Sequence, residues 1–100
     1  MSVNMKMIQQ MQNRLEKIQT ELAQMEIEGT SGGGVVTARV SGQREFIGVK
    51  IDPSAVDPDD VEMLEDLVNA AIKDAMTKAT ATAEEKMSAL TGGMKIPGLM

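Results

Sequence analysis

The stretch VVTARVSGQREFIGVKI, residues 35–51, decides the expected fold. From Val35 to Val40 it is rich in β-branched residues that alternate with a period of two, as in a half-buried strand. Ser41-Gly42-Gln43 is a turn signal, and the residues after Glu45 alternate again, with Ile47, Val49 and Ile51 on one face. We therefore expect a β-hairpin with strands at 35–41 and 45–51.

A glycine-rich segment, Gly29-Thr30-Ser31-Gly32-Gly33-Gly34, precedes this hairpin. It lacks the Gly-Lys-Ser/Thr ending of a phosphate-binding loop and does not open a helix, so a turn is the better interpretation. Residues 26–31 add a third strand at the edge of the sheet. The sequence thus predicts a short antiparallel sheet of three strands.

The segment before the sheet predicts a helix over about residues 5–27. Its apolar residues recur at alternating spacings of three and four, which is a coiled-coil heptad. Such a helix is about 35 Å long, whereas the radius of gyration of a compact 100-residue domain is only about 13 Å. The helix must overhang its own domain, and the simplest cover for its seam is a second copy of the chain. The predicted dimer interface consists of Ile8, Met11, Leu15, Ile18 and Leu22.

The segment after the sheet predicts a second long helix, over about residues 58–90. Asp52-Pro53 ends the last strand, because proline cannot donate to a strand ladder. Asp57 is a natural N-cap, and Pro58 suits the first helical position. Apolar residues keep helical spacing as far as Leu90. We expect one α+β domain over residues 1–91, with an α-β-β-β-α order, followed by a flexible tail at 92–100.

Composition and charge limit the possible partners. A chain of 100 residues makes one domain and buries little surface alone, so oligomerisation is expected. Without cysteine or a long apolar run, it is expected to be cytoplasmic, with no membrane contact. The net charge is −5, yet residues 1–50 carry +1 and residues 51–100 carry −6. A polyanion should therefore bind to residues 1–50 rather than to residues 51–100.

The sequence favours neither catalysis nor metal binding. It has no histidine or cysteine, and no serine or threonine has an evident base partner. Six carboxylates at 57–66 lack the spacing of a calcium loop and suit a solvated helix start. Several of the ten methionines lie on apolar seams, where methionine is an adaptable filler. We expect no enzymatic activity, cofactor, metal or small-molecule substrate.

A polar stripe on the first helix is the best candidate for a binding surface. Lys6, Gln10, Asn13, Lys17, Thr20 and Gln24 recur at three and four, and no carboxylate interrupts them. Cation and amide donors suit phosphate oxygens, although an ordinary solvated helix face has the same pattern. Arg14 lies beside the seam, and the second helix adds a weaker basic set. The predicted DNA contacts are Lys6, Gln10, Asn13, Arg14, Lys17, Lys78 and Lys86.

Several stretches together resemble the YbaB/EbfC family of bacterial nucleoid-associated proteins. The resemblance runs nearly the whole length of the chain, and it implies an α-β-β-β-α subunit that forms a tweezer-like homodimer with projecting helices. It also implies a DNA-binding protein that contributes to nucleoid organisation and the regulation of gene expression. The stretches that carry it are MKMIQQMQ (5–12), EGTSGGG (28–34), VKIDP (49–53), DPDDVEMLEDL (57–67), EKM (85–87), LTGG (90–93) and Pro97-Gly98.

Two functions remain open on the sequence. The first is a homodimer that binds double-stranded DNA with low sequence specificity, since a chain whose one aromatic residue is Phe46 has no platform for stacking single-stranded bases. The second is an acidic dimeric adaptor or chaperone-like clamp that grips a protein partner between its helices. Salt separates them, because binding to phosphates weakens steeply as salt rises and an apolar clamp does not.

Overall fold

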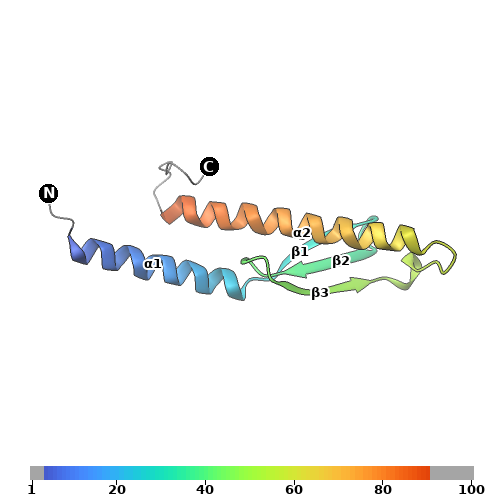
Figure 1. Ribbon diagram of the computed structural model, residues 1–100, viewed down its shortest axis with the longest axis horizontal. Helices are drawn as coiled ribbons and strands as arrows, with labels where there is room; N and C mark the ends of the chain where they lie inside the picture. The colour runs from blue at the N-terminus through green and yellow to red at the C-terminus, as the bar shows by residue number, and fades with distance from the viewer. Residues whose placement is uncertain (1–3, 91–100) are drawn as a thin grey trace.

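The computed structural model describes residues 4–90, which form two long helices and a three-stranded antiparallel sheet (Figure 1). The strand order is β1-β2-β3. The predicted α-β-β-β-α order and the α+β class are confirmed, while the tail predicted at 92–100 lies outside the described residues. The elements are α1 (Met5–Gln24), β1 (Ile27–Ser31), β2 (Val36–Val40), β3 (Phe46–Ile51), a single 3-10 turn η1 (Pro53–Ala55) and α2 (Val61–Leu90).

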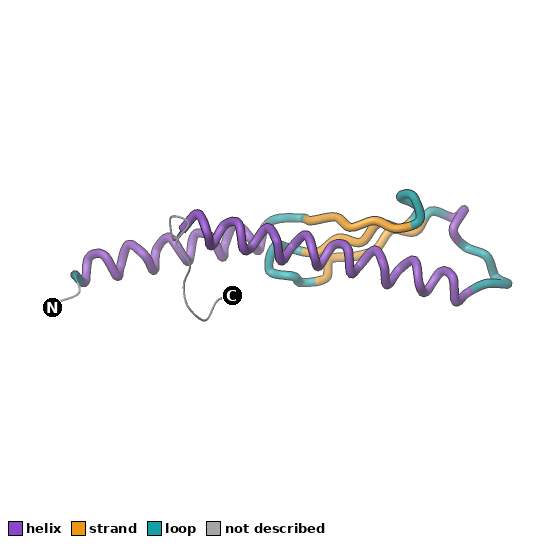
Figure 2. Tube along the Cα trace, turned by 90° about the horizontal axis from the view of Figure 1, so that it is seen from above, coloured by secondary structure: helices purple, strands orange, loops and turns teal. Residues whose placement is uncertain are grey.

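The core lies between α2 and one face of the sheet (Figure 2). Val36, Ala38 and Val40 of β2 are fully buried there. They face three alanines of α2 at four-residue spacing, Ala71, Ala75 and Ala79. Alanine side chains let the helix approach the sheet closely. On β1, Gly29 has no side chain at the point of contact, and an added Cβ there would collide with the backbone of Ala71 and Ala75. The sheet and α2 thus meet almost backbone to backbone.

Both predicted helices are shorter than expected at the ends that adjoin the sheet in sequence. The prediction for α1 ran to residue 27, but Met25 already has extended backbone angles and β1 starts at Ile27. A residue that pairs in a strand cannot also continue the helix, so the predicted overlap at 26–27 resolves in favour of the sheet.

The predicted start of α2 at residue 58, with Asp57 as the cap, is also wrong. Asp57 instead closes a turn, in which its Oδ1 accepts from the backbone N of Asp59 at 2.9 Å. Asp60 occupies the capping position, because its Oδ1 accepts from the backbone N of Met63 at 3.2 Å. The helix therefore begins at Val61, later than the sequence suggested.

The two loops of the sheet differ in what holds them. Gly32, Gly33 and Gly34 all have positive φ, between 61° and 98°, so the glycine run is the expected turn. In the β2–β3 loop the Ser41 hydroxyl accepts from the backbone N of both Gln43 and Glu45, each at 3.1 Å. The same loop holds the end of α1, since the backbone N of Gly42 donates to the carbonyl of Leu22 at 2.8 Å.

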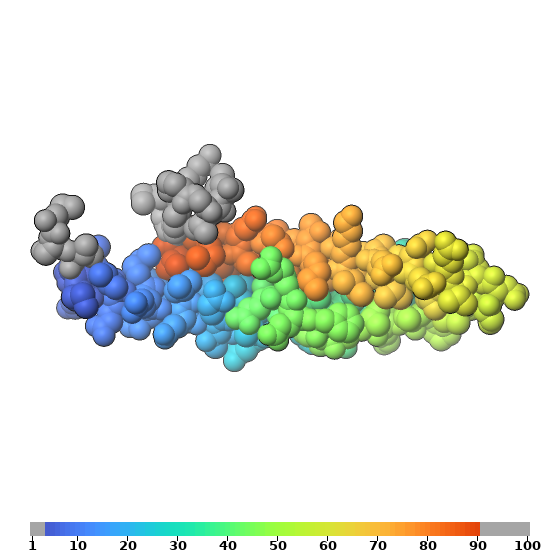
Figure 3. Space-filling model, viewed as in Figure 1, coloured from blue at the N-terminus to red at the C-terminus, as the bar shows by residue number. Residues whose placement is uncertain are grey.

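The first helix projects far beyond the sheet, as its length predicted (Figure 3). The molecule measures 69 × 24 × 16 Å, and its radius of gyration of 18.6 Å exceeds the roughly 13 Å of a compact domain of this size. The last turns of α2 run antiparallel beside α1, and α1 continues past them (Figure 1). Neither α1 nor α2 is long and apolar enough to cross a membrane.

Candidate nucleic-acid interface

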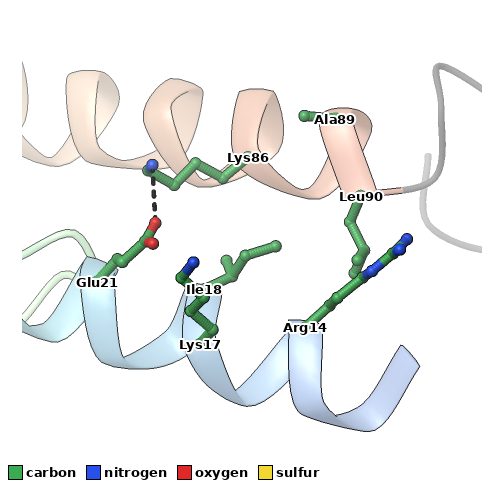
Figure 4. Close-up of a pocket in the computed structure, with 7 residues that line it drawn as sticks. All are labelled: Arg14, Lys17, Ile18, Glu21, Lys86, Ala89 and Leu90. Atoms are coloured by element: carbon green, nitrogen blue, oxygen red, sulfur yellow. Dashed lines mark hydrogen bonds and ion pairs between the residues drawn. The ribbon is translucent and has the colours of Figure 1, made fainter. Parts of the chain in front are cut away.

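An open hollow lies between α1 and the end of α2 in the described residues (Figure 4). Its volume is about 330 Å³. Because the two helices are antiparallel, the middle of α1 meets the last turns of α2, so residues distant in sequence face one another. The lining residues are Arg14, Lys17, Ile18, Glu21, Lys86, Ala89 and Leu90. We call this surface the basic hollow.

The basic hollow carries three cations and one carboxylate. Lys86 Nζ lies 3.1 Å from Glu21 Oε2, an ion pair that joins the two helices (Figure 4). Both side chains are partly exposed, so the pair contributes at most about 1 kcal/mol to stability. Arg14 and Lys17 are exposed and form no ion pair with another residue of the 4–90 range. The hollow therefore keeps a surplus of two positive charges.

The polar stripe of α1 extends this positive surface away from α2. Lys6, Gln10 and Asn13 are all exposed on the projecting part of the helix. Asn4 caps its start, since Asn4 Oδ1 accepts from the backbone N of Lys6 at 2.9 Å. The structure thus gathers six of the seven predicted DNA contacts on one end of the molecule: Lys6, Gln10, Asn13, Arg14, Lys17 and Lys86.

Lys78 lies elsewhere, at the edge of the sheet. Its Nζ is 3.1 Å from Asp74 Oδ2 and donates to the carbonyl of Glu28, just after β1 begins, at 3.4 Å. Asp74 also accepts from the backbone N of Thr30 at 3.0 Å. The Thr30 bond, and after it the one from Lys78, hold the pKa of Asp74 below its usual range. Lys78 is therefore engaged in fastening α2 to β1.

The predicted apolar seam of α1 divides into three parts. Ile8, Met11 and Leu15 are 37–43% exposed, so most of the seam is open to solvent in the single subunit. Ile18 lines the basic hollow. Leu22 is only 3% exposed, because the hairpin loop with Gly42 closes over it. Leu22 thus belongs to the core of its own subunit, and its burial needs no second copy.

Sequence reasoning missed Glu21, Ala89 and Leu90 as parts of this surface. Glu21 lies off the polar stripe, and its partner Lys86 is 65 positions away. A signal was present in the lengths of the helices, because a 30-residue α2 spans about 45 Å and must return past the sheet along α1. Which residues then meet depends on the loop lengths and the twist of the sheet.

Among residues 4–90, no three acidic side chains gather in a way that could hold a metal ion.

Comparison with known proteins identifies the family of the chain. The sequence model of the YbaB/EbfC DNA-binding family matches residues 1–94. A nucleoid-associated protein of Chloroflexus aurantiacus is 54% identical over 91% of both chains, and one of Alkaliphilus metalliredigens is 48% identical over 95% of this chain and 83% of its own.

A solved structure supports the fold. The uncharacterised protein HP0035 of Helicobacter pylori superimposes with a TM-score of 0.65 over 89% of each chain, at 21% identity. With the family match over nearly its full length and relatives at about half identity, the chain belongs to the YbaB/EbfC DNA-binding family of nucleoid-associated proteins.

Proposed function

We propose that this protein binds double-stranded DNA as a homodimer, through the basic hollow and the polar stripe of α1, with low sequence specificity. By binding and reshaping DNA it contributes to nucleoid organisation and the regulation of gene expression. One observation carries the proposal. Arg14, Lys17 and Lys86, from two helices far apart in the sequence, converge on one surface of a protein that is acidic overall.

The position of the charges decides whether an acidic protein can attract DNA. The acidic stretch 57–66 precedes and opens α2, whereas the basic hollow lies at the last turns of the same helix. A 30-residue helix separates its two ends by about 45 Å, several times the Debye length of about 8 Å at physiological salt. The carboxylates of the 57–66 stretch are therefore largely screened from a polyanion at the hollow.

The chemistry of the surface favours backbone contacts over base reading. Its donors are guanidinium, ammonium and amide groups, which suit phosphate oxygens, and phosphate contacts carry no sequence information. The single aromatic residue, Phe46, lies on β3 and away from the helical arm, which is α1 with the last turns of α2 beside it. A surface without stacking side chains favours duplex DNA over single strands.

The test is the salt dependence of binding to a duplex of arbitrary sequence, measured by fluorescence anisotropy. For a phosphate-binding protein we expect the affinity to fall steeply between about 50 and about 200 mM salt. The double variant Lys6→Gln, Lys17→Gln should bind all sequences more weakly. Because the two substitutions remove two cations from each subunit of the dimer, the salt slope should flatten by up to about four units, near one per cation that touches a phosphate.

Lys73→Gln is the matched control, because Lys73 is an exposed lysine of α2 outside the basic hollow. It should leave affinity and salt slope unchanged. If the double variant is folded and binds like the wild type, the stripe of α1 is not the contact surface.

The adaptor function has one observation in its favour, the exposed apolar side chains of Met7, Ile8, Met11 and Leu15 along α1. A clamp that uses this seam would hold a protein partner through apolar contacts. No measurable duplex affinity at low salt in this titration would favour the clamp over DNA binding.

A further inference from the structure

The covalent link between α1 and the sheet is short. Two residues separate α1 from β1, and the first of them, Met25, has extended backbone angles. A link of two residues does not by itself fix the direction of a 20-residue helix, because each residue adds two backbone torsions that can rotate. Other contacts must hold α1 beside α2, since the basic hollow exists only while Arg14 and Lys17 of α1 face Lys86 of α2.

The first tie between the two helices is ionic. It is the pair of Lys86 Nζ and Glu21 Oε2, which lie 3.1 Å apart. Both side chains are partly exposed, so dissolved salt weakens their attraction. In the proposed function Lys86 also binds a DNA phosphate, which competes with Glu21 for the same cation. The ionic tie is therefore weakest when the hollow binds DNA.

The second tie is the loop between β2 and β3, residues 41–45, which lies against the end of α1 (Figure 1). Gln43 Nε2 donates to the carbonyl of Gln19 at 3.0 Å and to Gln19 Oε1 at 3.1 Å. The backbone N of Gly42 donates to the carbonyl of Leu22 at 2.8 Å, and an added Cβ at Gly42 would lie 2.7 Å from that carbonyl oxygen. We call this loop, with its three hydrogen bonds to α1, the clasp. None of the three bonds involves a charged group, so salt screens none of them.

The clasp is stiff in itself. Ser41 is buried, and its hydroxyl accepts from the backbone N of Gln43 and of Glu45, each at 3.1 Å. The backbone N of Arg44 donates to the carbonyl of Ser41 at 2.9 Å, and Arg44 has a φ of 65°, a left-handed conformation that is costly for a residue with a side chain. Such a conformation persists where the surrounding structure holds it. The loop can therefore fix the position of α1 relative to the sheet.

The clasp holds α1 by a side that the DNA-binding surface does not use. Gln19 is two positions from Lys17 and two from Glu21, which both line the basic hollow. Residues two apart on a helix point to nearly opposite sides. The hollow and the polar stripe therefore stay open while the clasp is closed.

We propose that Gln43 is a positioning residue for DNA binding: through Gln19 it holds α1 at the angle that brings the cations of α1 beside Lys86. The uncharged clasp keeps this angle when salt or a bound phosphate loosens the ionic tie. This role rests on the DNA binding proposed above, and it assigns a part in that binding to a residue that touches no phosphate.

Two variants of equal charge separate positioning from electrostatics. In Gln43→Glu a carboxylate, which only accepts, replaces the donor and faces the two oxygens of Gln19, so the clasp opens. In Gln19→Glu the amide of Gln43 still donates to the backbone carbonyl and to the new carboxylate, so the clasp holds. Each variant adds one negative charge per subunit at the same contact, so a difference between them reports on the clasp.

The order of α1 is measured without DNA, by 15N relaxation and relaxation dispersion of its backbone amides. At about 1 M salt, where the Debye length is about 3 Å, we expect α1 to become mobile in Gln43→Glu and to stay ordered in the wild type and in Gln19→Glu. Equal order of α1 in the two variants would overturn the role of Gln43.

Amide exchange of the wild type tests the clasp without relying on the folding of a variant. The N–H of Gly42, which bonds to α1, should stay protected at the same high salt. Fast exchange at Gly42 in the folded wild type would show that the clasp is open and would overturn the proposal.

Titration with duplex DNA tests the effect on binding. We expect Gln43→Glu to bind about two- to tenfold more weakly than Gln19→Glu, the loss that about one net hydrogen bond represents. The salt slope should be the same in both, because the number of cations that touch phosphates is unchanged. A flatter slope in Gln43→Glu alone would indicate a lost phosphate contact and contradict a positioning role. If no protein of the set binds duplex DNA while α1 loosens in Gln43→Glu as expected, the proposed function fails and the clasp is a structural tie only.

Discussion

The sheet half of the molecule and its helical arm differ in how closely their side chains are packed. In the sheet half, Val36, Ala38 and Val40 are fully buried against three alanines of α2, and the helix and the sheet touch almost backbone to backbone. In the arm, by contrast, most side chains of α1 are exposed and a partly exposed ion pair ties the two helices.

This difference implies a division of labour. The sheet half supplies the free energy of folding, because that is where apolar surface is removed from water. The arm presents charge without depending on close packing. Substitutions in the two halves should therefore have effects of different kinds, and four comparisons test this, from the largest expected effect to the smallest.

The largest effect is expected from Gly29→Ala. The new Cβ would collide with backbone atoms of Ala71 and Ala75, which cannot move aside as a flexible side chain can. Overpacking of this kind costs about 1–3 kcal/mol and occasionally more, and we expect a loss of about 3 kcal/mol in the free energy of unfolding, measured by urea denaturation.

Gly48→Ala is the matched control, since Gly48 is also in a strand but its nearest neighbour to an added Cβ is the flexible end of Arg39 at 3.8 Å. It should change the stability by less than about 0.5 kcal/mol. Equal effects at both glycines would show that the close approach of α2 to β1 does not limit the fold.

Two leucines of the same helix give the next comparison. Leu22→Ala empties a buried site, at 3% exposure, and should cost about 2–4 kcal/mol. Leu15→Ala removes a side chain that is 38% exposed on the arm, and we expect less than about 1 kcal/mol. Thermal unfolding of both variants checks the ranking. A cost at Leu15 as large as that at Leu22 would mean that the arm is buried in the assembled protein.

The third comparison uses the one carboxylate of the basic hollow. Glu21→Gln removes the partner of Lys86 and raises the surplus of positive charge. An exposed pair is worth about 1 kcal/mol or less, so duplex affinity should rise by about two- to fivefold at low salt, with little change in stability. Glu65→Gln, an exposed carboxylate of α2 far from the hollow, is the control. Weaker binding by Glu21→Gln would contradict the assignment of the hollow to DNA.

The smallest effect concerns acid and the β1 edge. Hydrogen bonds from Thr30 and then Lys78 lower the pKa of Asp74 from its ordinary 3.8. A carboxylate with a lowered folded-state pKa stabilises the fold fully above its unfolded-state value, and this contribution is lost as the pH falls through the lower folded-state value. The stability of Asp74→Asn should therefore vary less with pH below about pH 4 than that of the wild type. Asp66→Asn, an exposed carboxylate of the same helix, should keep the wild-type profile.

The sequence by itself determined the element types and their order. Alternation fixed the hairpin around Ser41-Gly42-Gln43, heptad spacing fixed α1, and the length of α1 required an arm beyond the sheet. These features depend on the local periodicity and turn chemistry of the chain. The same local signals misplaced the start of α2, because Asp57 and Asp60 are both acceptable caps and only the path of the chain chose between them.

Only the tertiary structure decided which surfaces meet. It moved Leu22 from the predicted dimer seam into the core, set Lys86 and Glu21 3.1 Å apart across 65 positions, and separated Lys78 from the other cations. It also placed α2 over β1 and β2, so that Phe46, Ile47 and Val49 of β3 stay exposed although they are apolar. Periodicity tells which side of an element is apolar, whereas its partner is set by loop lengths, sheet twist and close packing over the whole chain.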